Sequence, residues 1–206
     1  MPRLSQNKDL PTAITNLRLC TALKDCGAIG VANAFDKSSA EHLYVYDDGD
    51  LRYTDWTDVE PAFVSKCFVV TNPNNITIAM LPLDNRIITG PSVIVGGVCD
   101  GMLLTDKEMC LIEFKTNVTS SSYITERAEE AIGQLWHTFN GIVKPRCATK
   151  SKDVEQLLSV DFYVVFDKDL EVTGANSALM DLQSQFLQDH KYPLTFDNKK
   201  EFLLKI

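Results

Sequence analysis

The chain has 206 residues, of which 45% are hydrophobic and 23% are charged, and its formal net charge is -8. This balance supports a buried core and excludes general disorder, and no run approaches the ~18 consecutive apolar residues of a membrane span. The acidic charge excludes general attraction of polyanions, so a nucleic-acid partner would need a local basic cluster or metal ions. Because the first residues lack the hydrophobic segment of a signal peptide, we expect a cytoplasmic protein with no membrane partner.

The six cysteines are widely spaced and form no Cys-x-x-Cys pair, so the sequence contains neither a zinc-knuckle pattern nor a redox pattern. In a cytoplasmic protein such cysteines are expected to be reduced and mostly buried.

Helix and strand signals begin near the N-terminus. The apolar spacing between Leu10 and Lys24 predicts a short helix, with Pro11 in its first turn. The apolar segments Leu43–Tyr46 and Leu51–Tyr53 flank the turn residues Asp47–Asp50, which predicts a β-hairpin.

The middle of the chain is predicted to be mostly β. Cys67–Thr71 and Ile76–Leu81 flank the turn residues Asn72–Asn75, which indicates a second hairpin. Further on, Val93–Val95 leads through two glycines into the apolar segment Val98–Leu104.

The C-terminal half alternates strand and helix signals. After a strand within Met109–Val118, apolar residues at helical spacing predict a helix from Ser120–Ser122 to Gly141, with serines as N-caps. Arg127, Glu130, Gln134 and His137 form a polar stripe on this helix. The later elements are a basic connection over Lys144–Lys152, a strand at Phe162–Phe166, a helix at Ser177–His190 and a terminal segment at Glu201–Ile206.

These elements favour one α/β domain over residues 1–206. Residues 1–92 are interpreted as an N-terminal helix with a β-rich elaboration, and residues 93–206 as the core. No internal repeat or linker divides the chain.

The polar tetrad Thr105–Glu108 lies between two apolar segments and indicates a tight hairpin turn. A loop of two residues and a loop of four give the same register, in which Asp100 lies directly opposite Glu113. The two carboxylates then share one face and are about 5 Å apart across the strands. Two facing carboxylates repel each other unless a cation lies between them, and oxygen ligands of this kind suit Mg²⁺.

Strand alternation places Glu113 and Lys115 on one face, whereas Cys110, Ile112 and Phe114 point to the other, buried face. A lysine beside two acids and a metal can hold an attacking water or balance charge on a phosphate. Two acids and a lysine therefore indicate metal-assisted hydrolysis of a phosphodiester. The alternative is a surface hairpin on which Glu113 and Lys115 are merely solvated.

Asp100, twelve intervening residues, and then Glu113-Phe114-Lys115 before an amphipathic helix resemble the PD-(D/E)XK nuclease superfamily. The resemblance covers roughly residues 93–166. It implies a restriction-endonuclease-like core, a mixed sheet flanked by helices in the order helix, three strands, helix, strand.

The resemblance also implies roles for individual residues. Asp100, Glu113 and the Phe114 carbonyl would hold Mg²⁺ or Mn²⁺, Lys115 would position or activate water, and Gln134 would assist, as in the RecB-like and lambda-exonuclease-like branches.

The chain departs from the family pattern at two positions and leaves a third open. Cys99 replaces the proline that often precedes the aspartate, and Thr138 stands where a tyrosine often follows the glutamine. Glu41 and Glu60 are both weak candidates for the upstream acidic residue. Asp197-Asn198-Lys199 also fits Asp-x-Lys, but no apolar strand flanks it.

The sequence thus predicts a Mg²⁺- or Mn²⁺-dependent nuclease, with DNA favoured over RNA as the substrate and a homo-oligomer as one option for its assembly. The alternative is a catalytically silent relative that binds nucleic acid or a protein partner through its β-rich part. The basic cluster consists of Lys144, Arg146, Lys150 and Lys152, and is interpreted as a backbone-contact surface or as a solvated loop.

Overall fold

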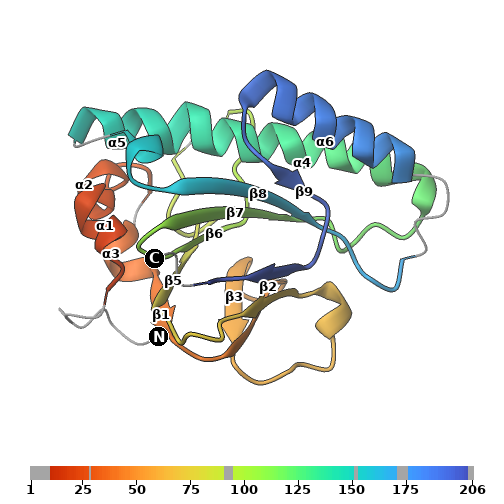
Figure 1. Ribbon diagram of the computed structural model, residues 1–206, viewed down its shortest axis with the longest axis horizontal. Helices are drawn as coiled ribbons and strands as arrows, with labels where there is room; N and C mark the ends of the chain where they lie inside the picture. Colours follow the sequence, from red (N-terminus) through yellow and green to blue (C-terminus); the bar gives the residue numbers. More distant parts are fainter. Residues whose placement is uncertain (1–9, 28, 91–94, 151–152, 171–175, 204–206) are drawn as a thin grey trace.

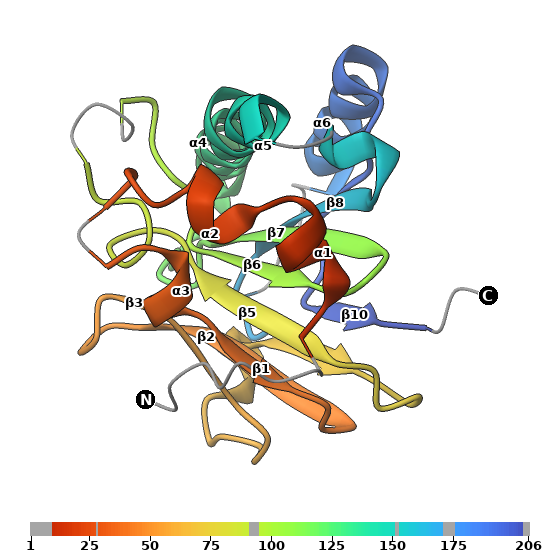
Figure 2. The same ribbon diagram turned by 90° about the vertical axis from the view of Figure 1, so that its left-hand side faces the viewer.

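The computed structural model describes residues 10–27, 29–90, 95–150, 153–170 and 176–203. These residues form three layers, in which helices cover one face of a six-stranded sheet and a four-stranded sheet covers the other face (Figures 1 and 2). The protein is therefore a mixed α/β fold, as the composition and the alternating elements predict.

The six-stranded sheet is mixed. Its strands, in spatial order, are β1 (Asp36–Ser38), β5 (Ile78–Pro82), β6 (Gly101–Leu104), β7 (Glu108–Phe114), β8 (Ser159–Val165) and β9 (Leu194–Thr195). Neighbours from β1 to β7 are antiparallel, whereas β7, β8 and β9 are parallel. The sheet takes β1 and β5 from the part before residue 92, so the β-rich N-terminal part and the core share one sheet.

The four-stranded sheet has the order β10 (Lys199–Glu201), β4 (Phe68–Thr71), β2 (His42–Asp48) and β3 (Tyr53–Thr57). Strands β2 and β3 pair antiparallel, with Asp48 facing Tyr53, so the first predicted hairpin forms. Its second strand runs over Tyr53–Thr57 rather than Leu51–Tyr53, because Leu51 and Arg52 lie in the turn. A short 3-10 helix, Val64–Lys66, precedes β4.

The second predicted hairpin is wrong, because β4 and β5 lie in different sheets. Buried Asn72 redirects the chain between them: its side-chain amide donates to the carbonyls of Ala40 and Ile76. All five residues of β5 are buried, which fits a strand covered on both faces rather than one arm of a surface hairpin.

The first helical segment is broken rather than continuous. It consists of α1 (Thr12–Asn16) and α2 (Leu19–Ala22), followed by α3 (Val31–Ala34). Pro11 is the N-cap of α1, and Arg18 has a left-handed φ of 50°, which ends the helical path between α1 and α2.

The long helix after the hairpin is confirmed, but it extends further than predicted, and its N-cap is Tyr123 rather than one of the serines. A 3-10 turn (Ser121–Tyr123) leads into α4 (Ile124–Trp136), a π-helical segment (His137–Val143) and α5 (Lys144–Lys150), so the basic connection is helical up to residue 150. Buried Ile142, Val143 and Cys147 continue the apolar stripe past Gly141, and this packing favours helix there. A 3-10 turn (Val154–Gln156) and α6 (Asn176–His190) follow.

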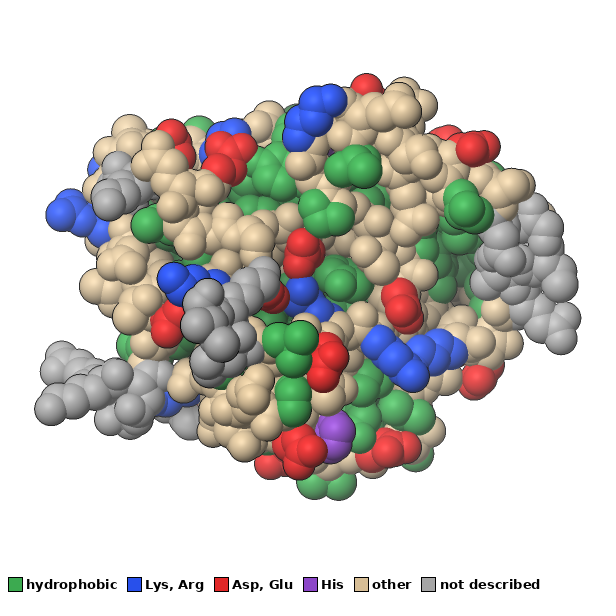
Figure 3. Space-filling view, viewed as in Figure 1, with side chains coloured by type: hydrophobic (Ala, Val, Ile, Leu, Met, Phe, Trp, Pro, Cys, Tyr) green, Lys and Arg blue, Asp and Glu red, His purple; other side chains and the backbone are tan. Residues whose placement is uncertain are grey.

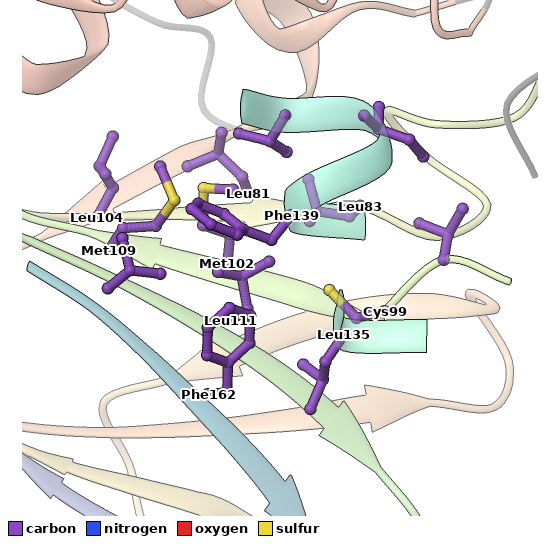
Figure 4. Close-up of a cluster of buried hydrophobic side chains, with 14 of the residues drawn as sticks. Leu81, Leu83, Cys99, Met102, Leu104, Met109, Leu111, Leu135, Phe139 and Phe162 are labelled. Carbon is purple, nitrogen blue, oxygen red and sulfur yellow. The ribbon is translucent and has the colours of Figure 1, made fainter. Parts of the chain in front are cut away.

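Both faces of the six-stranded sheet are buried. Figure 4 shows the core between the sheet and the helices, where Leu111 of β7 and Leu135 of α4 belong to one cluster. The second core lies between the two sheets and contains Cys110, Ile112 and Phe114. The odd-numbered residues of β7 therefore face the helices, and the even-numbered ones face the smaller sheet.

Within the described residues, no helix is long and apolar enough to cross a membrane. All six cysteines are free, and five of them are buried, as the sequence predicts. Val93 and Ile94 lie outside the described residues, whereas Val95 is exposed in a turn, and β6 begins only at Gly101.

Candidate functional site

The β6–β7 hairpin has the register that the sequence predicts. Pairing runs from Leu104 with Met109 to Gly101 with Ile112, and the next facing pair is Asp100 with Glu113. Asp100 lies directly before β6, at the end of the hairpin opposite to the tight turn.

Backbone hydrogen bonds hold the two carboxylates next to each other. The N–H of Asp100 donates to Oε2 of Glu113 at 3.2 Å. The N–H of Phe114 donates to Oδ2 of Asp100 at 2.6 Å. Each acidic side chain thus accepts from the strand that carries the other, which fixes both carboxylates at the strand ends.

Lys115 and Gln134 complete the cluster. The Nζ atom of Lys115 lies 2.9 Å from Oε1 of Glu113 and donates to Oε1 of Gln134 at 2.8 Å. The open end of the β6–β7 hairpin and helix α4 therefore bring together all four side chains that the sequence indicates. Glu113 is 2% exposed and Lys115 9% exposed, so the interpretation of a solvated surface hairpin is wrong.

Glu130 also belongs to this cluster, although sequence reasoning did not assign it to the site. Its Oε1 lies 3.6 Å from Nζ of Lys115, and its Oε2 accepts from Arg127 at 2.7 Å. The sequence feature that could have indicated Glu130 is its position on the polar stripe of α4, one turn before Gln134.

When both carboxylates are ionised, they carry one more negative charge than Lys115 neutralises. Burial raises the pKa of Glu113 well above its ordinary value, and the charge of Asp100 raises it further, against the opposing effect of Lys115. Burial also raises the pKa of Asp100, to about 7, although the Phe114 N–H and Lys115 act in the opposite direction. A bound cation would remove this imbalance.

Two further acids add to the negative potential at Asp100. Asp47 and Asp84 both raise the pKa of Asp100, and the three residues line a cavity of about 300 Å³. The remaining lining residues are Asp48, Gly49, Arg52, Tyr53, Thr54 and Asn85. The turn of the β2–β3 hairpin thus borders the site, which sequence reasoning did not indicate.

The loop before Asp100 packs directly on α4. A Cβ atom at Gly97 would lie 2.6 Å from Cγ of Gln134, and Gly97 has a positive φ of 82°, so this close approach requires glycine. The Gly97 carbonyl lies 2.7 Å from Nδ1 of His137, and this contact fixes His137 beside the loop rather than as a metal ligand.

Thr138, which stands where the resembling family often has tyrosine, joins the same loop to the helix. Its Oγ1 accepts from the Cys99 N–H at 2.8 Å and donates to the Gln134 carbonyl at 2.8 Å. Thr138 thus orients the backbone immediately before Asp100.

The other candidate residues lie outside the cluster. Asn198, within the rejected Asp-x-Lys sequence, donates to the carbonyls of Ser65 and Phe166 and so has a structural role. Lys144 pairs with Glu155 at 2.9 Å, and Lys152 lies outside the described residues. Glu60 accepts from the Tyr44 hydroxyl at 3.3 Å. Glu41 lies directly before β2 of the other sheet, and its Oε1 is 4.0 Å from Nε2 of His42.

Among the residues that the structure describes, no group of three or more His, Cys, Asp or Glu side chains has the geometry of a metal site. The possible protein donors at the cluster are two carboxylates, of Asp100 and Glu113, and the Phe114 carbonyl. This oxygen-only set suits Mg²⁺, which binds through one or two carboxylates and keeps several waters, and it does not suit zinc.

In comparisons with known proteins, no family model, no curated protein and no solved structure matches this chain.

Proposed function

We propose that this protein is a divalent-metal-dependent nuclease that hydrolyses phosphodiester bonds, with DNA as the favoured substrate. The observation that supports it most directly is the convergence of Asp100, Glu113 and Lys115 at buried strand ends, with two carboxylates whose charge one lysine does not balance. A bound cation would stabilise the ionised forms of both acids, whose pKa values are raised by burial.

The order of elements supports the proposal further. Strands β5, β6 and β7, helix α4 and strand β8 follow one another as in the last five elements of the restriction-endonuclease-like core. The acids and the lysine lie on the hairpin of β6 and β7, and Gln134 lies on the following helix, as the resemblance to the PD-(D/E)XK superfamily implies.

Asp100, Glu113 and the Phe114 carbonyl are the groups that would hold Mg²⁺ or Mn²⁺ in this proposal. The ion would supply Lewis acidity toward a phosphoryl oxygen and would lower the pKa of a bound water. The two carboxylates are held by the Asp100 and Phe114 backbone N–H groups, so they bind with little reorganisation.

Lys115 has the position of a group that acts on the reacting water or phosphate. Glu113 and Gln134 accept from its ammonium on two sides, so the positive charge is fixed within the cluster. A fixed charge of this kind stabilises negative charge that develops in the transition state. Gln134 acts as a positioning residue, because its contact is with Lys115.

Cleavage of supercoiled plasmid tests the proposal. Purified protein should nick or linearise the plasmid with Mg²⁺ or Mn²⁺, should be inactive with EDTA, and should regain activity when excess metal is restored. Linear duplex DNA, single-stranded DNA and RNA tested in parallel would identify the substrate class.

A Glu113→Gln variant prepared in the same way controls for contaminating nucleases, since it changes one buried oxygen to an amide nitrogen. Lack of cleavage of all four nucleic acids by the wild-type protein with either metal would contradict the proposal. It would leave the alternative of a silent module that binds nucleic acid or protein.

A further inference from the structure

A second cavity, of about 200 Å³, lies beside the candidate site and is lined by Asn117, Val118, Thr119, Tyr123 and Arg127. The Val118 N–H donates to the Lys115 carbonyl at 3.3 Å, which closes a tight turn directly after β7. One wall of this cavity therefore begins two residues after the lysine of the site.

Arg127 connects the cavity to the cluster. Its guanidinium donates to Oε2 of Glu130 at 2.7 Å, and Oε1 of the same carboxylate lies 3.6 Å from Nζ of Lys115. The side chain is 49% exposed. Because a guanidinium has five N–H donors, it can contact Glu130 and a phosphate at the same time.

Tyr123 supplies an aromatic surface to the same cavity. Its side chain is 59% exposed, although it lies at the start of α4 next to buried Ile124. Tyr123 and Arg127 are four residues apart at the beginning of the helix, so their side chains lie on the same side of it. An exposed ring beside a cation is the combination that binds unpaired nucleotides, through base stacking and a phosphate contact.

We propose that this cavity binds an unpaired nucleotide that flanks the scissile phosphate. Arg127 contacts the phosphate of this nucleotide, Tyr123 stacks on its base, and Asn117 and Thr119 offer polar groups to the base or sugar. The inference rests on the proposed nuclease function for the position of the scissile phosphate. It deepens that function by naming single-stranded or frayed nucleic acid as the substrate, because stacking in a duplex covers both faces of a base.

Binding of a labelled single-stranded oligonucleotide of about ten nucleotides tests this proposal by fluorescence anisotropy. The measurements use the full chain with Mg²⁺ in a Lys115→Met background, so that the ligand stays intact. Tyr123→Ala should weaken binding about five- to tenfold, whereas Tyr123→Phe should bind like the parent, since the ring is retained. Arg127→Gln should weaken binding and reduce the salt slope by about 0.7, the value for one phosphate on a single strand.

An oligonucleotide with abasic positions separates the two contacts. Tyr123→Ala should bind it as the parent does, whereas Arg127→Gln should still bind it more weakly. Arg18 is an exposed arginine between α1 and α2, and Arg18→Gln is the matched control. It should change the affinity for neither the intact nor the abasic oligonucleotide. Parallel measurements with RNA of the same sequence and with blunt duplex DNA show whether the cavity prefers DNA to RNA and single strands to duplex.

Unchanged affinity in both Tyr123→Ala and Arg127→Gln, or lack of single-strand binding by the parent, would overturn the subsite. If binding depends on both residues but the wild-type protein cleaves nothing, the subsite stands and the nuclease proposal fails. The two proposals therefore fail in distinguishable ways.

Discussion

Strand β7 has a buried glutamate at each end, and the two ends differ in how the charge is satisfied. At the start, Glu108 lies 3.2 Å from Nζ of Lys200, and the same ammonium lies 2.6 Å from Asp161. Near the other end, Glu113 lies 2.9 Å from Nζ of Lys115, close to Asp100. Apart from the more exposed Glu130 beside Lys115, each cluster thus has two acids and one lysine, and the two clusters face opposite sides of the sheet.

The Lys200 cluster joins the two sheets. Lys200 is on β10, whereas Glu108 and Asp161 are on β7 and β8, and the ammonium also lies 4.9 Å from the ring centre of Phe202. Burial by itself lowers the pKa of Lys200, but Cys110 and Asp161 outweigh it and raise the pKa above its ordinary value. The lysine is thus firmly charged, as expected of a structural ion pair.

The Lys115 cluster differs in which charged groups are destabilised. Here the pKa values of the two acids are raised, and the acids Asp47 and Asp84 add further negative charge next to Asp100. The comparison teaches that a count of acids and lysines does not identify a site. The type of group whose charged form is destabilised does, and at this end two carboxylates are destabilised, which a cation would stabilise.

The largest expected effect is the loss of activity in Glu113→Gln. Removal of this carboxylate should lower cleavage by at least about a thousandfold, because it removes a metal ligand and the partner of Lys115. The metal-free unfolding free energy should stay within about 1 kcal/mol of the wild-type value, since a repelling buried charge is lost together with an ion pair. Cleavage rates and urea unfolding with EDTA measure the two quantities.

Glu108→Gln is the matched control at the other end of the strand. It should destabilise the protein and leave the cleavage rate per folded molecule unchanged. Equal cleavage rates for Glu113→Gln and wild type would show that the two ends do not differ in function.

Lys115→Met should lower turnover by about a hundredfold to ten-thousandfold with little change in KM, because its charge acts mainly in the transition state. Methionine keeps much of the length of the side chain, so packing should change little. Metal binding, measured by titration calorimetry with Mn²⁺, should remain, since lysine is not a ligand. An unchanged turnover number would remove Lys115 from the mechanism.

Lys200→Met should show the reverse pattern. The variant leaves Glu108 and Asp161 without their shared cation, and breaking a buried ion pair in this way should cost about 3 kcal/mol of unfolding free energy. Turnover of the folded protein should stay at the wild-type value. A large fall in turnover without loss of stability would contradict the structural role of this cluster.

The sequence predicted the cluster better than it predicted the surrounding fold. The polar turn Thr105–Glu108 determines the hairpin register by itself, and strand alternation then brings Asp100, Glu113 and Lys115 together. Helical periodicity placed Gln134 on the polar stripe of the helix, and the resemblance to the PD-(D/E)XK superfamily placed it beside the site. These are local relations, in which short spacing along the chain determines the geometry.

Relations between distant segments could not be predicted in the same way. The residues of β4 and β5 have the sequence pattern of a hairpin, but the two strands lie in different sheets. A local pattern predicts a strand and does not determine which other strand it pairs with. Similarly, the contact of the β2–β3 turn with Asp100 depends on how the smaller sheet packs. The contact of Gly97 with Gln134 depends on a loop path that residue type alone does not determine.

The smallest expected effect is a pH dependence of stability that metal removes. Burial raises the pKa of Asp100 to about 7, against an ordinary value of about 3.9 in the unfolded chain. The folded state therefore binds the proton more tightly, and this stabilising contribution is complete below about pH 4 and is lost as the pH rises through about 7. The metal-free unfolding temperature should fall by a few degrees between about pH 5 and pH 8.

Mg²⁺ should oppose this fall in unfolding temperature most strongly at about pH 8. The ion binds deprotonated carboxylates, and at lower pH protons compete with it for these groups. Thermal unfolding by circular dichroism, with EDTA or with Mg²⁺, measures both effects. Asp100→Asn should flatten the metal-free profile, since it removes one titrating acid and relieves the repulsion that helps to raise the pKa of Glu113. Lys200→Met should lower the unfolding temperature at every pH without changing its dependence on pH, because the partners of Lys200 lie at the other end of β7. If Asp100→Asn keeps the wild-type pH dependence of the unfolding temperature, the raised pKa of Asp100 is not its source. The two ends of β7 would then not differ in their electrostatics as proposed.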